Sequence, residues 1–107
     1  MSVRDRLPPP DVVLGFDDYD APAARLAAQM GVRYAKVAVH RFPDGESRVT
    51  VPVPLPAHVA MCRSLDHPND KLVETILAAE AARRNGARSI SLIAPYLCYM
   101  RQDVAFH

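Results

Sequence analysis

The stretch HVAMCRSLDHPNDKLVETILAAEAARRNGARSISLIA, residues 58–94, carries the order of elements that decides the fold. Its two ends, residues 58–63 and 89–94, are short apolar runs of the kind that forms buried strands. Between them, apolar residues recur at helical spacing: Leu72, Val73, Ile76 and Leu77. A strand, a helix and a strand in this order predict a βαβ unit with parallel strands and a right-handed crossover.

The helix of this unit has a start signal and a stop signal. Segment 66–70 joins the first strand to the helix, and we interpret Asn69 as a cap that accepts hydrogen bonds from first-turn amides. Arg83 and Arg84 fall in the last turn, and Gly86 follows as the stop. A helix N-terminus behind a strand can also bind an anion, but the cap is the simpler interpretation.

The first third of the chain predicts one strand and one helix. Residues 1–10 are charged and rich in proline, which indicates a loose lead-in. The β-branched run 11–15 predicts a strand that ends at a glycine. Asp20 is a candidate cap for an alanine-rich helix over residues 23–30, and Gly31 is the natural stop of that helix.

The middle of the chain predicts a β-hairpin. Residues 34–42 read as one strand, 43–45 as the turn Pro-Asp-Gly, and 48–53 as an alternating second strand. Pro52 has no amide to donate, so the second strand lies at an edge or ends irregularly. Together, these elements predict an α/β fold with a partly parallel sheet, flanking helices and a hairpin.

The hairpin turn is the first candidate site. It carries an aromatic ring on Phe42 and carboxylates on Asp44 and Glu46. A ring can stack on a base, and carboxylates can accept hydrogen bonds from a base amino group or a ribose hydroxyl. Taken alone, a Pro-Asp-Gly turn between two strands is more often a hairpin turn and nothing more.

The second candidate site is Arg101-Gln102-Asp103, which follows the strand at 89–94. Ligands of open α/β sheets bind beyond the carboxyl ends of the strands. The guanidinium of Arg101 matches phosphate oxygens, and the amide of Gln102 can both donate and accept. Taken alone, such a segment is more often a solvated charged loop.

Composition limits the classes of function. The chain has 107 residues, of which 50% are hydrophobic and 23% charged, and this fits one globular domain. A net charge of +1 gives no footprint for nucleic acid or for an anionic membrane. The N-terminus does not resemble a signal peptide, and no apolar run is long enough to span a bilayer. We therefore expect a cytoplasmic protein.

Cysteine and histidine form no metal motif in the sequence. Cys62 and Cys98 have no near partner, so we expect two reduced, buried thiols, with a single disulfide as the alternative. None of the four histidines stands at metal-ligand spacing from another His, Cys or carboxylate: His40, His58, His67 and His107. No metal ligand is assigned.

Three segments, taken in their order and spacing, resemble the ribose-phosphate pyrophosphokinase family. Residues 42–46 are similar to the F-P-D-G-E loop of that family, and 69–72 to the N-D-x-L that starts its next helix. Residues 95–103 are similar to its P-Y-x-x-Y-x-R-Q-D motif. The resemblance extends from about Leu14 to Asp103.

The resemblance implies a Rossmann-like, phosphoribosyltransferase-like fold and a site for ATP. The residues that match nucleotide-contacting positions are Phe42, Asp44, Gly45, Glu46, Arg101, Gln102 and Asp103. The implied reaction transfers diphosphate from ATP to ribose 5-phosphate, with Mg²⁺, and gives phosphoribosyl pyrophosphate and AMP. Because the F-P-D-G-E loop of the family reaches into a neighbouring subunit, a homo-oligomer that shares its nucleotide site is also implied.

Two features of this chain depart from the family. The turn after the first strand, residues 15–20, is bulkier and more acidic than the family's turn. The family's magnesium ligands, catalytic loop and sugar-phosphate loop lie downstream, so no catalytic residue is assigned. Residues 11–107 therefore read as an N-terminal domain that stops before the catalytic half and is incomplete at its C-terminus. The alternatives are a non-catalytic ATP-binding or subunit-association module, and a truncated product without function.

Overall fold

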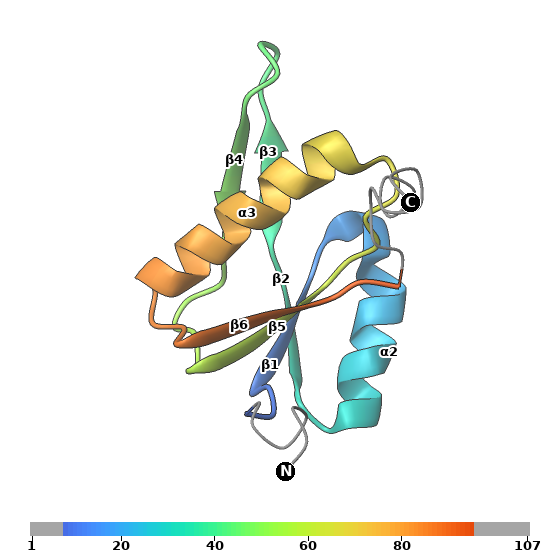
Figure 1. Cartoon of the computed structure of the whole chain (residues 1–107), viewed down its shortest axis with the longest axis vertical. Coiled ribbons are helices and arrows are strands. Elements are labelled where there is room, and N and C mark those ends of the chain that lie inside the picture. The colour runs from blue at the N-terminus through green and yellow to red at the C-terminus, as the bar shows by residue number, and fades with distance from the viewer. Residues whose placement is uncertain (1–7, 96–107) are drawn as a thin grey trace, which may run out of the picture.

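The chain alternates strands and helices, and the computed structural model describes residues 8–95 of it (Figure 1). The elements in chain order are β1 (Val12–Gly15), the 3-10 helix η1 (Asp17–Tyr19), α2 (Asp20–Met30), β2 (Arg33–Lys36), β3 (Ala38–Arg41), β4 (Ser47–Thr50), β5 (His58–Cys62), α3 (Pro68–Arg84) and β6 (Ser89–Ile93). The predicted α/β fold is confirmed.

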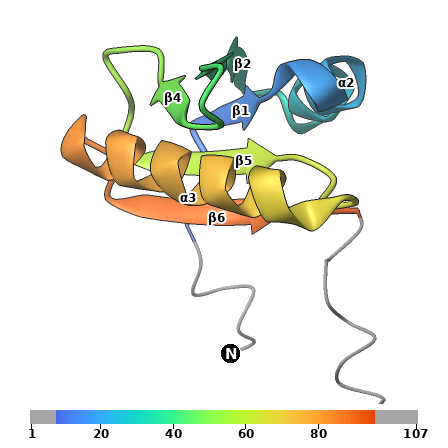
Figure 2. The same ribbon diagram turned by 90° about the horizontal axis from the view of Figure 1, so that it is seen from above.

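Four strands form a parallel sheet in the order β2-β1-β5-β6. Two βαβ units build it: α2 connects β1 to β2, and α3 connects β5 to β6. The units lead outward from the two central strands, so that the sheet grows to one side through α2 and to the other through α3. In Figure 2, α2 lies beside β1 and β2, while α3 runs along β5 and β6.

The core has two layers because alternate residues of a strand face opposite sides of the sheet. On one side, Leu14 of β1 and Met61 of β5 pack with Ala78 of α3. On the other side, Val13 of β1 packs with Ala23 of α2. The central strands are therefore covered on both faces, as the continuous apolar runs of a parallel sheet require.

The segment 34–42 does not form the one strand that its sequence predicts. It divides at Val37: β2 pairs parallel with β1, and β3 pairs antiparallel with β4 in a separate sheet. The amide of Val37 donates to the carbonyl oxygen of Gly15 at 2.8 Å, and Gly15 is the last residue of β1. Beyond that point β2 has no neighbour to pair with, and the chain continues into the hairpin. The predicted hairpin itself is confirmed.

Both helices begin earlier than predicted, so that each predicted cap residue lies inside its helix. α2 starts at Asp20 with Tyr19 at the N-cap, and the carboxylate of Asp20 accepts a hydrogen bond from the hydroxyl of Tyr34. α3 starts at Pro68 with His67 at the N-cap, so Asn69 is already its second residue. Neither Asp20 nor Asn69 is therefore the N-cap residue that the sequence predicted. In α3, the proline at the first helical position is itself a start signal.

The buried face of α3 is not its most apolar face. Val73 and Ile76 are exposed, whereas Glu74 is buried together with Thr75 and a run of alanines, Ala78, Ala81 and Ala82. Small side chains allow the helix to lie close to the sheet and to the hairpin. No helix in the part of the chain that the structure describes is long and apolar enough to cross a membrane.

Candidate functional site

Polar side chains gather where the central strands β1 and β5 end. Phe16, Asp17 and Asp18 follow β1 directly, and Arg63 follows β5. The two βαβ units lead away from this point in opposite directions. In open α/β sheets, ligands bind at such a topological switch point, beyond the carboxyl ends of the strands.

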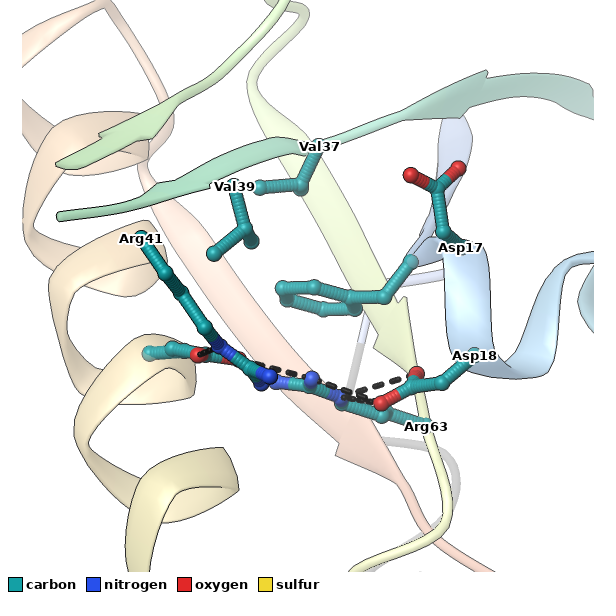
Figure 3. A pocket seen from close by; sticks show the side chains of 8 residues that line it. Asp17, Asp18, Val37, Val39, Arg41 and Arg63 are labelled. Atoms are coloured by element: carbon teal, nitrogen blue, oxygen red, sulfur yellow. Dashed lines mark hydrogen bonds and ion pairs between the residues drawn. The ribbon is translucent and has the colours of Figure 1, made fainter. Parts of the chain in front are cut away.

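A cavity of about 340 Å³ opens at this point (Figure 3). Its lining residues come from the ends of β1 and β5, from the hairpin and from α3: Phe16, Asp17, Asp18, Val37, Val39, Arg41, Arg63 and Glu74. The side chains of Arg41 and Arg63 converge in it, the first from the hairpin and the second from the end of β5 (Figure 3). The cavity therefore has apolar walls on the hairpin side and a charged floor.

Glu74 binds both arginines at the floor of the cavity. Its side chain is 1% exposed; one carboxylate oxygen accepts from Nη2 of Arg63 and the other from Nε of Arg41, each at 2.8 Å. Burial acts to raise the pKa of this carboxyl, but the hydrogen bonds and charges of Arg41 and Arg63 outweigh it and lower the pKa below its usual value. Glu74 is therefore held as a carboxylate.

Arg63 ties the ends of β1 and β5 together. Its side chain is only 2% exposed, and its guanidinium donates from Nη2 to Asp18 at 2.8 Å. It also lies over the ring of Phe16, with 4.2 Å between the guanidinium carbon and the ring centroid. A buried arginine with two carboxylate partners and an aromatic face below it is fixed in one orientation.

The acidic turn after β1 has partners that explain its composition. Asp17 accepts from Nζ of Lys36 at 2.9 Å, and Asp18 accepts from Arg63. The departure of this turn from the family pattern is therefore matched by basic residues elsewhere in the same chain. At the end of β1, the ring of Tyr34 lies against Gly15, and burial with the Asp20 hydrogen bond raises the pKa of the Tyr34 hydroxyl.

The hairpin turn presents the residues that the sequence singled out. Phe42 is 39% exposed, and its ring meets His40 edge-on, with 4.5 Å between the ring centroids. Asp44 accepts from the amide of Glu46 at 3.0 Å, which closes the turn. Gly45 has φ 93°, a conformation that other residues rarely adopt. Phe42, Asp44 and Glu46 are thus on one exposed turn, as predicted.

A second cavity, of about 350 Å³, lies between this turn and the start of α3. Its lining residues come from both elements: Gly45, Glu46, Ser47, Asp70 and Val73. The turn therefore borders the cavity beside α3, and Arg41, directly before the turn, lines the cavity at the strand ends.

The remaining predicted site residues, Arg101, Gln102 and Asp103, lie outside the described residues. β6, which leads toward them, ends at Ile93, on the same edge of the sheet as β1 and β5. Within residues 8–95, no group of three or more His, Cys, Asp or Glu side chains is placed to hold a metal ion.

Cys62 is a buried free thiol, and burial raises its pKa. This agrees with the interpretation of a reduced, buried cysteine for that residue, while Cys98 lies outside the described residues.

Sequence reasoning missed three side chains of the cavity: Asp18, Arg63 and Glu74. Asp18 and Arg63 each follow a central strand, and this position was the available signal. Glu74 carried no signal, because a glutamate inside a helix usually faces water.

The fold is similar to that of a solved phosphoribosyltransferase. The structure is similar to a purine phosphoribosyltransferase from Pyrococcus horikoshii, with a TM-score of 0.59, over 85% of this chain and 66% of that one. The sequence identity between the two is 19%, so this likeness concerns the fold alone.

The sequence is similar to a particular group of enzymes. The family "N-terminal domain of ribose phosphate pyrophosphokinase" matches residues 12–107. Ribose-phosphate pyrophosphokinases of Methanopyrus kandleri and Saccharolobus solfataricus are 43% and 35% identical over 89% of this chain, and that of Halobacterium salinarum is 40% identical over 78%. This chain belongs to the ribose-phosphate pyrophosphokinase family. It spans 33% of the length of the first two relatives and 30% of the third.

Proposed function

We propose that this chain forms the nucleotide-binding part of an enzyme that transfers diphosphate from ATP to ribose 5-phosphate. The products would be phosphoribosyl pyrophosphate and AMP. The observation that carries this proposal is the exposed turn with Phe42, Asp44 and Glu46, in a chain that belongs to the family of these enzymes. The Phe42 ring contacts His40 and Arg48 but is 39% exposed, so it can stack on adenine. The carboxylates can accept from the amino group of the base or from the ribose hydroxyls.

In this proposal, ATP is held from two sides. The turn, with Gly45 giving it its shape, supplies one side, and Arg101, Gln102 and Asp103 supply the other by resemblance to the family. The ring and carboxylates bind the nucleoside, while a guanidinium suits the phosphates. Because ribose 5-phosphate attacks the β-phosphorus of ATP through its anomeric hydroxyl, the role of this part is to position the donor.

Magnesium and the catalytic groups belong to the rest of the proposed enzyme. The described residues do not offer a magnesium site, since their carboxylates near the strand ends are paired with Arg41, Arg63 and Lys36. We place the magnesium ligands, the catalytic residues and the ribose 5-phosphate site downstream of this chain, and the whole enzyme in the cytoplasm.

The proposed enzyme is a homo-oligomer. Val73, Ile76 and Leu77 make an exposed apolar stripe on α3, and Val73 also borders the cavity beside the turn. An exposed apolar patch with a polar rim favours association with another protein surface. A second copy seated on this stripe would receive the turn at a shared site.

Two measurements on the 107-residue chain test the proposal. Isothermal titration with ATP should give saturable binding, and an assay for AMP release with ribose 5-phosphate and Mg²⁺ should give none. Absence of ATP binding would contradict the proposed nucleotide site. Turnover that depends on ribose 5-phosphate would show that the catalytic groups lie within this chain.

The alternative is a module that binds ATP or joins subunits without catalysis. The exposed turn and the apolar stripe favour it as much as they favour the enzyme, because nucleotide binding by the turn and association through the stripe do not need catalytic groups. Adding the chain to a full-length relative and following oligomer mass and activity separates the two. A change in mass or activity supports the module, and no change in either rejects it.

A further inference from the structure

The β3–β4 hairpin requires contacts with the rest of the protein to hold its turn in place. β3 and β4 form a two-stranded sheet of their own, and a lone hairpin is marginally stable in water. At its base, Val39 and Val49 pack against the core that β1, β5 and α3 share. Closer to the turn, Arg41 is the last residue of β3 and stands directly before Phe42.

Arg41 is bound to the body through Glu74. Its Nε donates to Glu74 at 2.8 Å, although most of the Arg41 side chain is exposed. Among the ion pairs of residues 8–95, this contact lies nearest to the turn and joins the hairpin to α3. Arg41 bonds to Glu74 through Nε and also lines the cavity at the strand ends.

The charges around Glu74 stabilise its contact with Arg41. Two carboxylates, on Glu74 and Asp18, both pair with the buried Arg63, and Asp18 has Lys71 3.9 Å away as a further cation. Arg41 supplies the second positive charge, so that a hairpin that moved away would leave Glu74 buried with half its compensation. A buried carboxylate that loses a partner is strongly unfavourable. The same carboxylate thus restrains both the hairpin and the end of β5.

We propose that Glu74 is a positioning residue that, through Arg41, sets the direction in which the turn at Phe42–Glu46 presents its ring and carboxylates to a nucleotide. This inference rests on the proposed function for the role of the turn. The restraint on the turn itself rests on the contacts of Glu74 alone, and the two are measured separately.

Hydrogen exchange tests the restraint in the full 107-residue chain. The amide of Phe42 donates to Glu46, and that of Gly45 donates to Phe42, so both amides report closure of the turn. In Glu74→Gln and in Arg41→Gln, these two amides should exchange roughly tenfold faster, since a hydrogen bond between charged groups is lost. Amides of β1 should keep their wild-type rates in both variants. Those at the end of β5, next to Arg63, should do so in Arg41→Gln, where the Arg63–Glu74 pair is intact.

Glu80→Gln is the matched control. Glu80 lies on the same helix, and its exposed side chain pairs only loosely with Arg84, at 3.9 Å. Wild-type exchange at Phe42 and Gly45 in this control supports the proposal. Equal acceleration of all amides in Glu74→Gln would assign Glu74 a general structural role and overturn the proposal. If circular dichroism shows that Glu74→Gln does not fold, the exchange rates of Arg41→Gln alone test the proposal. Arg41→Gln should fold, because the altered side chain is largely exposed.

ATP affinity tests the consequence for the nucleotide. Glu74→Gln and Arg41→Gln should each bind ATP roughly tenfold more weakly than the wild type, and the double variant no more weakly than the weaker single variant. Additive losses would mean that Glu74 does not act through Arg41. If the wild type binds no ATP, the proposed function fails, while the exchange rates still support or overturn the restraint on the turn.

Discussion

The central strands and the hairpin differ in what their side chains do. All four residues of β1 are buried, and β5 is buried from Val59 to Cys62. In contrast, β4 alternates between half-buried and exposed positions, and β3 is exposed except at the half-buried Val39. The central strands lie in the core, and the hairpin carries an aromatic ring and carboxylates to the surface. Substitutions in the core should therefore change the free energy of unfolding, and substitutions at the turn should change binding.

The largest expected effect is that of Leu14→Ala in β1. Leu14 is 0% exposed and packs between β5 and α3, so its truncation leaves a cavity and should lower the free energy of unfolding by about 3 kcal/mol. Urea unfolding followed by circular dichroism measures this. Leu92→Ala in β6, where the leucine is 41% exposed, is the control and should lose less than about 1 kcal/mol. Equal losses of unfolding free energy in the two variants would contradict the difference in burial between Leu14 and Leu92.

A smaller effect is expected for Gly15→Ala, at the end of β1. A Cβ on Gly15 would lie 2.8 Å from a ring carbon of Tyr34, whose hydroxyl is bonded to Asp20. Because the ring must move, the substitution should cost about 2 kcal/mol of unfolding free energy. In a Tyr34→Ala background the ring is gone, and Gly15→Ala should cost nothing further. A persistent cost in that background would assign the effect to the backbone instead.

The smallest effect on stability is expected for Phe42→Ala, in the turn. Because the ring contacts the exposed side chains of His40 and Arg48 and is 39% exposed to water, its removal should lower the free energy of unfolding by less than about 1 kcal/mol. The same urea titration measures it. A loss as large as that of Leu14→Ala would place Phe42 in the core and break the contrast between the two regions.

The elements were predictable from the sequence, and their division between two sheets was not. Apolar runs at 58–63 and 89–94, with a helix between them, led to the parallel pair of β5 and β6. The segment 34–42 kept an unbroken strand pattern, because both of the sheets that it enters favour the same residue types. The segment leaves the parallel sheet at Val37, because β1 ends at Gly15 and offers no further residue to pair with.

The turn at Phe42–Glu46 was predictable as a candidate site, and the ion pairs behind it were not. A short motif holds the residues of the turn together in sequence, whereas Asp18, Arg63 and Glu74 are far apart in the chain and meet only after folding. Glu74 lies between apolar residues of the helix, and the face that it shares with alanines is the one that α3 buries. Helical periodicity alone does not tell which face packs when the bulky side chains stay exposed.

Titration of the chain with ATP, in the wild type and in Phe42→Ala, tests whether the turn binds the nucleotide. Met30→Ala, which alters a side chain of nearly equal exposure on α2, is the control, at 40% against 39% for Phe42. The account predicts that Phe42→Ala binds ATP roughly tenfold more weakly, the effect of one lost base-stacking contact, while Met30→Ala binds as the wild type does. Equal ATP affinity in the wild type and in Phe42→Ala would contradict the assignment of the turn to the nucleotide site.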